Sequence, residues 1–172
     1  MLGFFTCAEK GRADAILAAL AEALAGAGLP VAGMVRAAMA GERACEMHLR
    51  LLPSGRVMSI SQPLGPGADA CTLDAGALEE AVAATAAAIA QAPEGAALIL
   101  NKFGRQEALG RGGRGLIGQG LEAGLKVLLS VPPETRAAFE SFAEGMAEEL
   151  PAEPAALAEF LAPGLGLRFK PF

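Results

Sequence analysis

The sequence predicts an α/β fold: a mainly parallel sheet between two layers of helices, with an antiparallel β-hairpin added at the sheet edge. Two observations support this fold class. Short apolar runs alternate with stretches of helical periodicity along most of the 172 residues. Between residues 43 and 62 the pattern changes to two extended runs around a Pro-Ser-Gly turn. No internal repeat or linker is present, so we expect one domain over residues 1–172, with a C-terminal tail from about residue 151.

The first elements are predicted to form a βαβ unit. A short apolar strand is expected from Gly3 to Thr6, and a second strand from Val31 to Arg36. The segment between them ends at two glycines, Gly26 and Gly28, which are typical of a helix C-terminus. Its inward face is expected to carry Ile16, Leu17, Leu20 and Leu24. A helix joining neighbouring strands in this way predicts parallel pairing with a right-handed crossover.

The middle of the chain is predicted to hold the hairpin and a second strand-helix alternation. The hairpin is expected between Cys45 and Ser61, around Pro53-Ser54-Gly55. A helix capped by Asp74 should follow the glycine- and proline-rich loop, because aspartate at this position accepts from free backbone N–H groups. The fully apolar run from Ala97 to Asn101 is typical of a strand buried on both faces.

The last third is less regular. It begins with a loop or interrupted helix rich in glycine and arginine, "KFGRQEALGRGGRG", followed by a weak helix. A further strand is expected from Lys126 to Val131, and one helix over "PPETRAAFESFAEGMAEEL", with proline in its first turn. The remaining residues are expected to form a short helix and a surface tail.

Composition excludes several classes of protein. With 53% hydrophobic and 19% charged residues, the chain is not intrinsically disordered. A net charge of -5 and a pI near 5.0 argue against a general nucleic-acid binder, which needs many cations to displace counterions. No apolar run has the length of a membrane span, and the first residues do not resemble a secretory leader. We therefore expect a cytoplasmic protein without a membrane partner.

The cysteines and the single histidine give no metal-binding pattern. Cys7, Cys45 and Cys71 have no zinc-like spacing and, being odd in number, cannot all pair, so we expect reduced thiols. On a strand Cys45 and His48 would point to opposite faces. These residues are expected to be small core or surface residues, although Cys71 could approach either of the other two. No metal site is predicted.

Ligands of open α/β sheets bind beyond the carboxyl ends of the strands. Three loops lie in such positions: Thr6 to Ala13, Asn101 to Arg114, and Ser61 to Cys71. They are the candidates for a functional site.

The first loop, "TCAEKGRA", matches half of the phosphate-binding pattern G-x-x-x-x-G-K-[ST]. Gly11 takes the second glycine and Arg12 the lysine, whereas Thr6 and Ala13 replace the first glycine and the hydroxyl residue. Lys10, Gly11 and Arg12 are therefore candidate anion ligands at the start of a helix. The alternative is an ordinary strand-to-helix turn, and Glu9 would repel phosphate.

The second loop follows a buried strand that ends in Asn101-Lys102. In nucleotide hydrolases of this architecture the corresponding strand ends in an acidic residue that holds Mg²⁺, often followed by a second acid. An amide and a base occupy both positions here. Asn101, Lys102, Gly104 and Arg105 are thus candidates for a metal-free anion site, facing the same pocket as the first loop. A solvated basic loop is the alternative.

Three strings of the sequence resemble a known family: "CEMHL", "ISQPLGPGADACTLDAGAL" and "LILNKFGRQEALGRGGRGLI". The family is an uncharacterised bacterial group of nucleoside-triphosphatase-like proteins, a domain of unknown function found in molybdenum-related gene neighbourhoods. The resemblance runs from about Gly3 to Pro132. That family in turn resembles the small cancer-related and thermophilic nucleoside-triphosphatases, whose strand ends in D-E-I-G-K-M-E where this chain has N-K-F-G-R-Q-E.

The resemblance implies a three-layer, P-loop-NTPase-like fold with degenerate Walker A and B motifs. It implies a protein that holds a nucleotide or small oxyanion without efficient hydrolysis, with a role in molybdenum metabolism. Two alternatives stay open. One is a slow or divergent nucleoside-triphosphatase, or a transferase using Lys102 or Glu107. The other is a non-catalytic regulatory protein with a remnant site. Cofactors, protein partners and oligomeric state are left open by the sequence.

Overall fold

The computed structural model describes residues 1–65 and 70–169. Along the chain the elements are β1 (Leu2–Phe5), α1 (Arg12–Gly26), β2 (Val31–Ala37), β3 (His48–Leu52), β4 (Val57–Ser59), β5 (Ser61–Pro63), β6 (Cys71–Leu73), α2 (Ala75–Gln91), β7 (Ala97–Lys102), α3 (Arg105–Ala108), α4 (Arg114–Glu122), β8 (Lys126–Ser130), the 3₁₀ helix η1 (Pro133–Thr135), α5 (Arg136–Ala143), β9 (Ala147–Glu149) and α6 (Pro154–Leu161).

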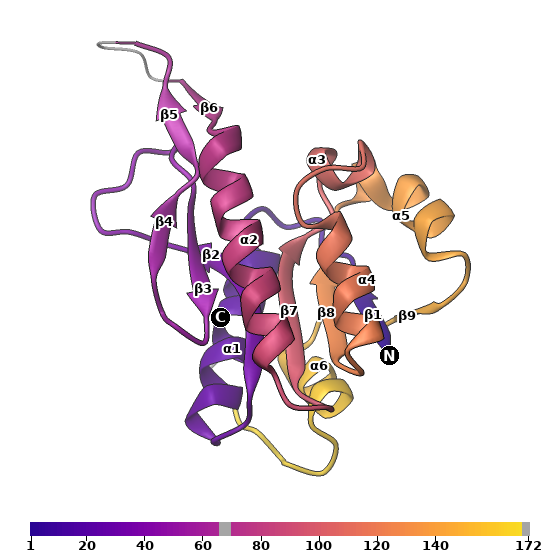
Figure 1. The fold of residues 1–172 in the computed structure, drawn as a ribbon. Helices are drawn as coiled ribbons and strands as arrows, with labels where there is room; N and C mark the ends of the chain where they lie inside the picture. Colours follow the sequence, from indigo (N-terminus) through magenta and orange to yellow (C-terminus); the bar gives the residue numbers. More distant parts are fainter. Residues whose placement is uncertain (66–69, 170–172) are drawn as a thin grey trace.

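Seven strands form one sheet in the order β4-β3-β2-β7-β8-β1-β9. Strands β2, β7, β8, β1 and β9 run parallel, while β3 and β4 add an antiparallel hairpin at one edge (Figure 1). Strands β5 and β6 pair with each other in a small second sheet. The predicted mainly parallel sheet with an added hairpin is confirmed.

Two apolar cores lie on opposite faces of the sheet, giving three layers (Figure 1). One core packs α1 and α6 against the sheet, through residues such as Leu17 and Leu157. The other packs α2, α4 and α5, through residues such as Leu78, Ile117 and Phe139. Because helices cover both faces, the first four residues of β7 are all buried, as its fully apolar run predicts.

Local signals in the sequence operate as expected. The Asp74 carboxylate accepts a hydrogen bond from the Ala77 N–H at 3.0 Å and caps α2.

Gly33 has a φ of 135° in the middle of β2, and a Cβ there would overlap the Ile99 carbonyl oxygen of β7. Only glycine allows these two strands to approach so closely.

The C-terminal third differs from the prediction in two ways. The expected long helix after Pro132 stops at Ala143, because Glu144 and Gly145 adopt left-handed backbone conformations with φ of 47° and 80°. The chain then forms β9, which pairs with the free edge of β1. The short helix predicted after residue 151 is confirmed as α6, but it is not part of a surface tail, since it buries Leu157 and Leu161 against α1 and β8. The last three residues of the predicted tail, 170–172, lie outside the described residues.

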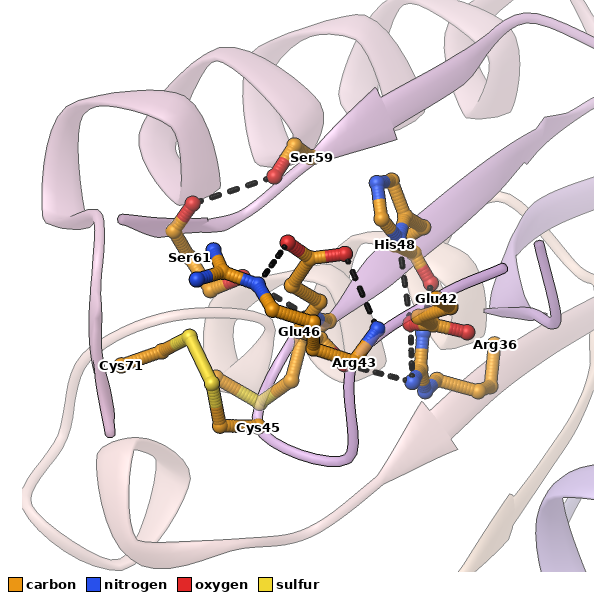
Figure 2. Close-up of a disulfide and its surroundings, with 10 residues drawn as sticks. Arg36, Glu42, Arg43, Cys45, Glu46, His48, Ser59, Ser61 and Cys71 are labelled. Atoms are coloured by element: carbon orange, nitrogen blue, oxygen red, sulfur yellow. Dashed lines mark hydrogen bonds and ion pairs between the residues drawn. A yellow bond between two sulfur atoms is a disulfide. The ribbon is translucent and has the colours of Figure 1, made fainter. Parts of the chain in front are cut away.

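The prediction of reduced thiols is wrong for two of the three cysteines. Cys45 and Cys71 form a disulfide between the β2–β3 loop and β6 (Figure 2). The pairing depends on strand β6, which was not predicted and which folds back along β5 to bring Cys71 beside Cys45. Cys7 is a free thiol.

None of the helices in the described parts of the chain is both long and apolar enough to cross a membrane.

Candidate functional site

The two candidate loops emerge at the same edge of the sheet. Strands β1, β8 and β7 are consecutive and parallel, so their carboxyl ends lie side by side. The loop after β1 contains the first candidate residues, and the loop after β7 contains the second. Strand β8 separates the two loops. The common edge agrees with the prediction.

The first loop is open to solvent. Gly11 has a φ of 80° and is the N-cap of α1, a conformation that favours glycine. Lys10, Gly11 and Arg12 are exposed. The Arg12 guanidinium donates to Glu9 at 3.1 Å, in an exposed pair. An anion at this loop would therefore compete with Glu9 for Arg12.

Asn101 at the end of β7 connects three strands. Its side-chain oxygen accepts a hydrogen bond from the Arg36 N–H of β2 at 3.1 Å. Its carbonyl oxygen accepts from the Ser130 hydroxyl of β8 at 2.7 Å. The neutral amide at the end of β7 thus joins β2, β7 and β8.

Sequence reasoning missed Asp14, which lies in the first turn of α1. Burial raises the pKa of its carboxyl above the ordinary value, against the opposing influence of Lys102, Arg36 and the Asn101 side chain. An acid therefore does approach the end of β7, from a helix rather than from the strand. Its position one residue after Ala13, in the first turn of the predicted helix, was the available signal.

A cavity of about 340 Å³ opens beside the end of β7. Its apolar wall is formed by Met34, Met47, Leu49, Ile60, Leu73 and Leu78. The other lining residues, here called the rim, are Asn101, Lys102, Gly104, Arg105, Gln106, Glu107, Pro132 and Glu134. Of these, Lys102, Arg105 and Glu134 are exposed.

The cavity brings together only part of the predicted site. Asn101, Lys102, Gly104 and Arg105 border it. Among the described residues, none from the Thr6 to Ala13 loop does, so the prediction that both loops face one pocket is corrected. The physical reason is that α1 covers the opposite face of the sheet from α2, whose Leu78 forms part of the wall. The third candidate loop contributes Leu73, and its residues 66–69 lie outside the described residues.

Glu107 is a structural residue of this site. One of its carboxylate oxygens accepts from the Gly104 N–H at 2.8 Å and the other from the Gly113 N–H at 2.9 Å. The side chain is buried. With both oxygens bonded to the backbone, Glu107 holds the loop around α3 and is not available as a catalytic base. The Arg114 guanidinium donates to the Glu107 carbonyl oxygen at 3.5 Å and lies 4.6 Å from the centre of the Phe142 ring.

His48 and the disulfide belong to a separate cluster beside the cavity wall. His48 Nδ1 lies 3.1 Å from Oε1 of Glu42 (Figure 2). The same oxygen accepts a hydrogen bond from the Arg36 guanidinium at 2.6 Å. Arg36 also donates to the Glu46 carbonyl oxygen at 2.7 Å. These contacts order the β2–β3 loop that carries Cys45. In residues 1–65 and 70–169, no three His, Cys, Asp or Glu side chains are grouped so as to hold a metal ion.

Three comparisons relate this chain to known proteins. The chain is 40% identical over 139 residues to the molybdenum import ATP-binding protein ModC 2 of Bradyrhizobium diazoefficiens. The match covers 80% of this chain but only 15% of that protein. The solution structure of a human cancer-related nucleoside triphosphatase superposes with a TM-score of 0.56 over 86% of both chains, at 16% identity, which confirms the nucleoside-triphosphatase-like fold. The family described as "Protein of unknown function (DUF2478)" matches residues 4–160, and the chain belongs to this family.

Proposed function

We propose that this protein binds a nucleotide or small oxyanion at the carboxyl edge of its parallel sheet, without efficient hydrolysis. The proposal depends on two observations at the end of β7. Lys102 borders the cavity. Asn101, in the position of a metal-binding acid, is hydrogen-bonded to the Arg36 N–H. A cation at the mouth of a cavity attracts anions.

Cations of the site are free to interact with a ligand. Within the described parts of the chain, neither Lys102 nor Arg105 forms an ion pair with a carboxylate. Lys10 and Arg12 add positive charge at the same sheet edge, although Arg12 is paired with Glu9. An anion near Lys102 and Arg105 would gain charge-assisted hydrogen bonds.

The same residues argue against Mg²⁺-dependent hydrolysis. Ala13 has no oxygen for a metal, and Asn101 is neutral and already bonded. Asp14 is near this position, but burial raises the pKa of its carboxyl and so disfavours the ionised form that a metal ion needs. Lys102 and Arg36, which act in the opposite direction on this pKa, would compete with a metal ion for the carboxylate. Without a bound metal, the charge that develops on a transferring phosphoryl group lacks its main stabilisation.

A role in molybdenum metabolism is part of the proposal and is supported by the relative named as a molybdenum import ATP-binding protein. Molybdate and tungstate are oxyanions, as are phosphate and sulfate, so the same cations would attract all four. They belong in one panel with ATP and GTP.

Calorimetric titration with this panel tests binding, with and without Mg²⁺. We expect Lys102→Ala to weaken binding about tenfold, which corresponds to the loss of one charge-assisted contact of about 1.4 kcal/mol. The matched control is Arg56→Ala, since Arg56 lies in the β3–β4 turn at the opposite edge of the sheet. Equal affinities of the wild type and Lys102→Ala, or no binding of any member of the panel, would overturn the proposal.

Hydrolysis is tested separately. We expect phosphate release from Mg²⁺-ATP or Mg²⁺-GTP to stay far below the roughly 1 per second of ordinary enzymes. Ala13→Ser should not restore activity, because the neutral Asn101 and the cationic Lys102 still occupy the strand end. Turnover near 1 per second in the wild type would instead support the alternative of a divergent nucleoside-triphosphatase.

A further inference from the structure

The cavity beside β7 is more apolar than an inorganic anion requires. Four buried side chains, Met34, Leu49, Ile60 and Leu78, form its wall together with the partly buried Met47 and Leu73. Its volume of about 340 Å³ lies at the lower end of small-molecule pockets. Phosphate at the rim would leave this wall in contact with water, whereas an apolar group inside would remove it from water.

The wall is a built feature that joins several segments of the chain. The Met47 N–H donates to the Ser61 hydroxyl and the Ile60 N–H to the Met47 carbonyl, both at 2.8 Å. The Asp74 N–H donates to the Ile60 carbonyl at 2.9 Å. Cys45, two residues before Met47 in the chain, is joined by its disulfide to Cys71 of β6 (Figure 2). These bonds fix the wall before any ligand arrives, so little ordering is required on binding.

The polar side chains that line the cavity come from the end of β7, from α3 and from η1. Lys102 and Arg105 supply two cations there, and Gln106 supplies an amide. Two carboxylates also border it. Glu107 is bonded to backbone N–H groups through both oxygens, whereas Glu134 is exposed at the rim. The ionised form of Asp14 would offset part of the positive charge of Lys102, which lies near it. Within the described residues neither Lys102 nor Arg105 forms an ion pair, so both cations can meet a ligand.

From this arrangement we infer that the ligand is an organic anion with a ring-sized apolar group. The apolar group lies against the wall of Met34, Leu49, Ile60 and Leu78, and a phosphate group meets Lys102 and Arg105. The inference rests on the proposed function and narrows it: the best ligand is an organic phosphate rather than a free inorganic oxyanion. The apolar part of the ligand supplies affinity that the rim cations alone do not.

The experiment compares two probes, 1-naphthyl phosphate and inorganic phosphate, by calorimetry on the full chain. They share the anionic group and differ in the ring. We expect naphthyl phosphate to bind at least about tenfold more tightly, since burying some tens of Å² of apolar surface is enough for this factor. A variant with both Lys102→Ala and Arg105→Ala should bind both probes more weakly.

Met47, a partly buried residue of the wall, is replaced by tryptophan to fill the cavity. The matched control is Met146→Trp, because Met146 is 66% exposed and outside the cavity lining. We expect Met47→Trp to weaken naphthyl phosphate about tenfold while phosphate affinity stays unchanged, and Met146→Trp to alter neither. Circular dichroism reports whether each variant is folded. Leu73→Trp replaces Met47→Trp if that variant does not fold.

The outcomes separate this inference from the proposed function. Equal affinities for the two probes, with both lowered by the Lys102 and Arg105 substitutions, overturn the inference and leave the proposed function standing. Naphthyl phosphate that binds regardless of these two cations, or equally well in the cavity-filling variant, also overturns it. Binding of neither probe overturns both.

Discussion

Removing the Glu107 carboxylate tests whether this residue holds the site together. Its two oxygens accept from the N–H groups of Gly104 and Gly113 at 2.8 and 2.9 Å, and the side chain is only 9% exposed. Glu107→Gln keeps one acceptor and turns an amide NH₂ toward the other N–H donor. A hydrogen bond to a charged group contributes about 1.5–3 kcal/mol, so we expect a loss of about 2 kcal/mol in the free energy of unfolding.

Glu107→Ala should cost more, about 3–5 kcal/mol, because both N–H groups lose their partner and become buried without one. Urea unfolding measures the two changes. With an m value of about 2 kcal/mol/M, Glu107→Gln should lower the midpoint by about 1 M.

The matched control is Glu134→Gln, at an exposed carboxylate on the same cavity rim for which the described residues offer no hydrogen-bond partner. Its effect should stay within about 0.5 kcal/mol. If Glu107→Gln changes the free energy of unfolding no more than Glu134→Gln, the carboxylate does not stabilise the loop, and the transferase hypothesis that uses Glu107 would regain support.

Three further predictions follow from the neighbouring groups. Because burial raises the pKa of Asp14, its ionised form destabilises the folded state as pH rises above the ordinary value of 3.8. Asp14→Asn should therefore raise the thermal midpoint at neutral pH and tighten phosphate binding. Weaker phosphate binding by this variant would contradict the placement of Asp14 beside Lys102. For Glu42, burial acts to raise the pKa, but hydrogen bonds from Arg36, His48 and the Met39 N–H lower it to about 2. The stabilising contribution of Glu42 should be complete above pH 4.5 and lost as pH falls toward 2. Across this range the free energy of unfolding should depend less on pH in Glu42→Gln than in the wild type. The same pH dependence in both proteins would argue against the contacts of Glu42 with Arg36 and His48. Finally, the Cys45–Cys71 disulfide closes a segment of 26 residues, so Cys71→Ser should lower the free energy of unfolding by about 3 kcal/mol in the absence of reductant. With dithiothreitol present, the variant and the wild type should have equal free energies of unfolding. A difference that persists in dithiothreitol would assign the effect to packing of the thiol.

Local chemistry in the sequence was sufficient to predict most of the fold. Apolar runs separated by helical segments predicted β1, β2, β7 and β8, and the change of pattern around Pro53-Ser54-Gly55 predicted the β3–β4 hairpin. The Asp74 cap and the buried strand of β7 follow from interactions within a few residues. Such features are readable because their cause lies in neighbouring residues.

Contacts between distant segments were decided only by the tertiary structure. Strand β9 exists because β1 offers an unpaired edge, and its sequence, Ala147–Glu149, is compatible with the predicted helix. The disulfide requires β6 to fold back along β5 before Cys71 can reach Cys45. No local pattern encodes either event.

The candidate site shows the same division. Sequence alone identified Asn101, Lys102, Gly104 and Arg105 as the loop at the sheet edge, because they directly follow a buried strand. It could not show that α1 places Arg12 on the other face, or that Asp14 reaches toward Lys102. It also could not show that six apolar side chains from six elements or loops meet beside that edge. These relations depend on the sheet order and the faces that the helices cover, which are set by packing of the whole chain rather than by any one segment.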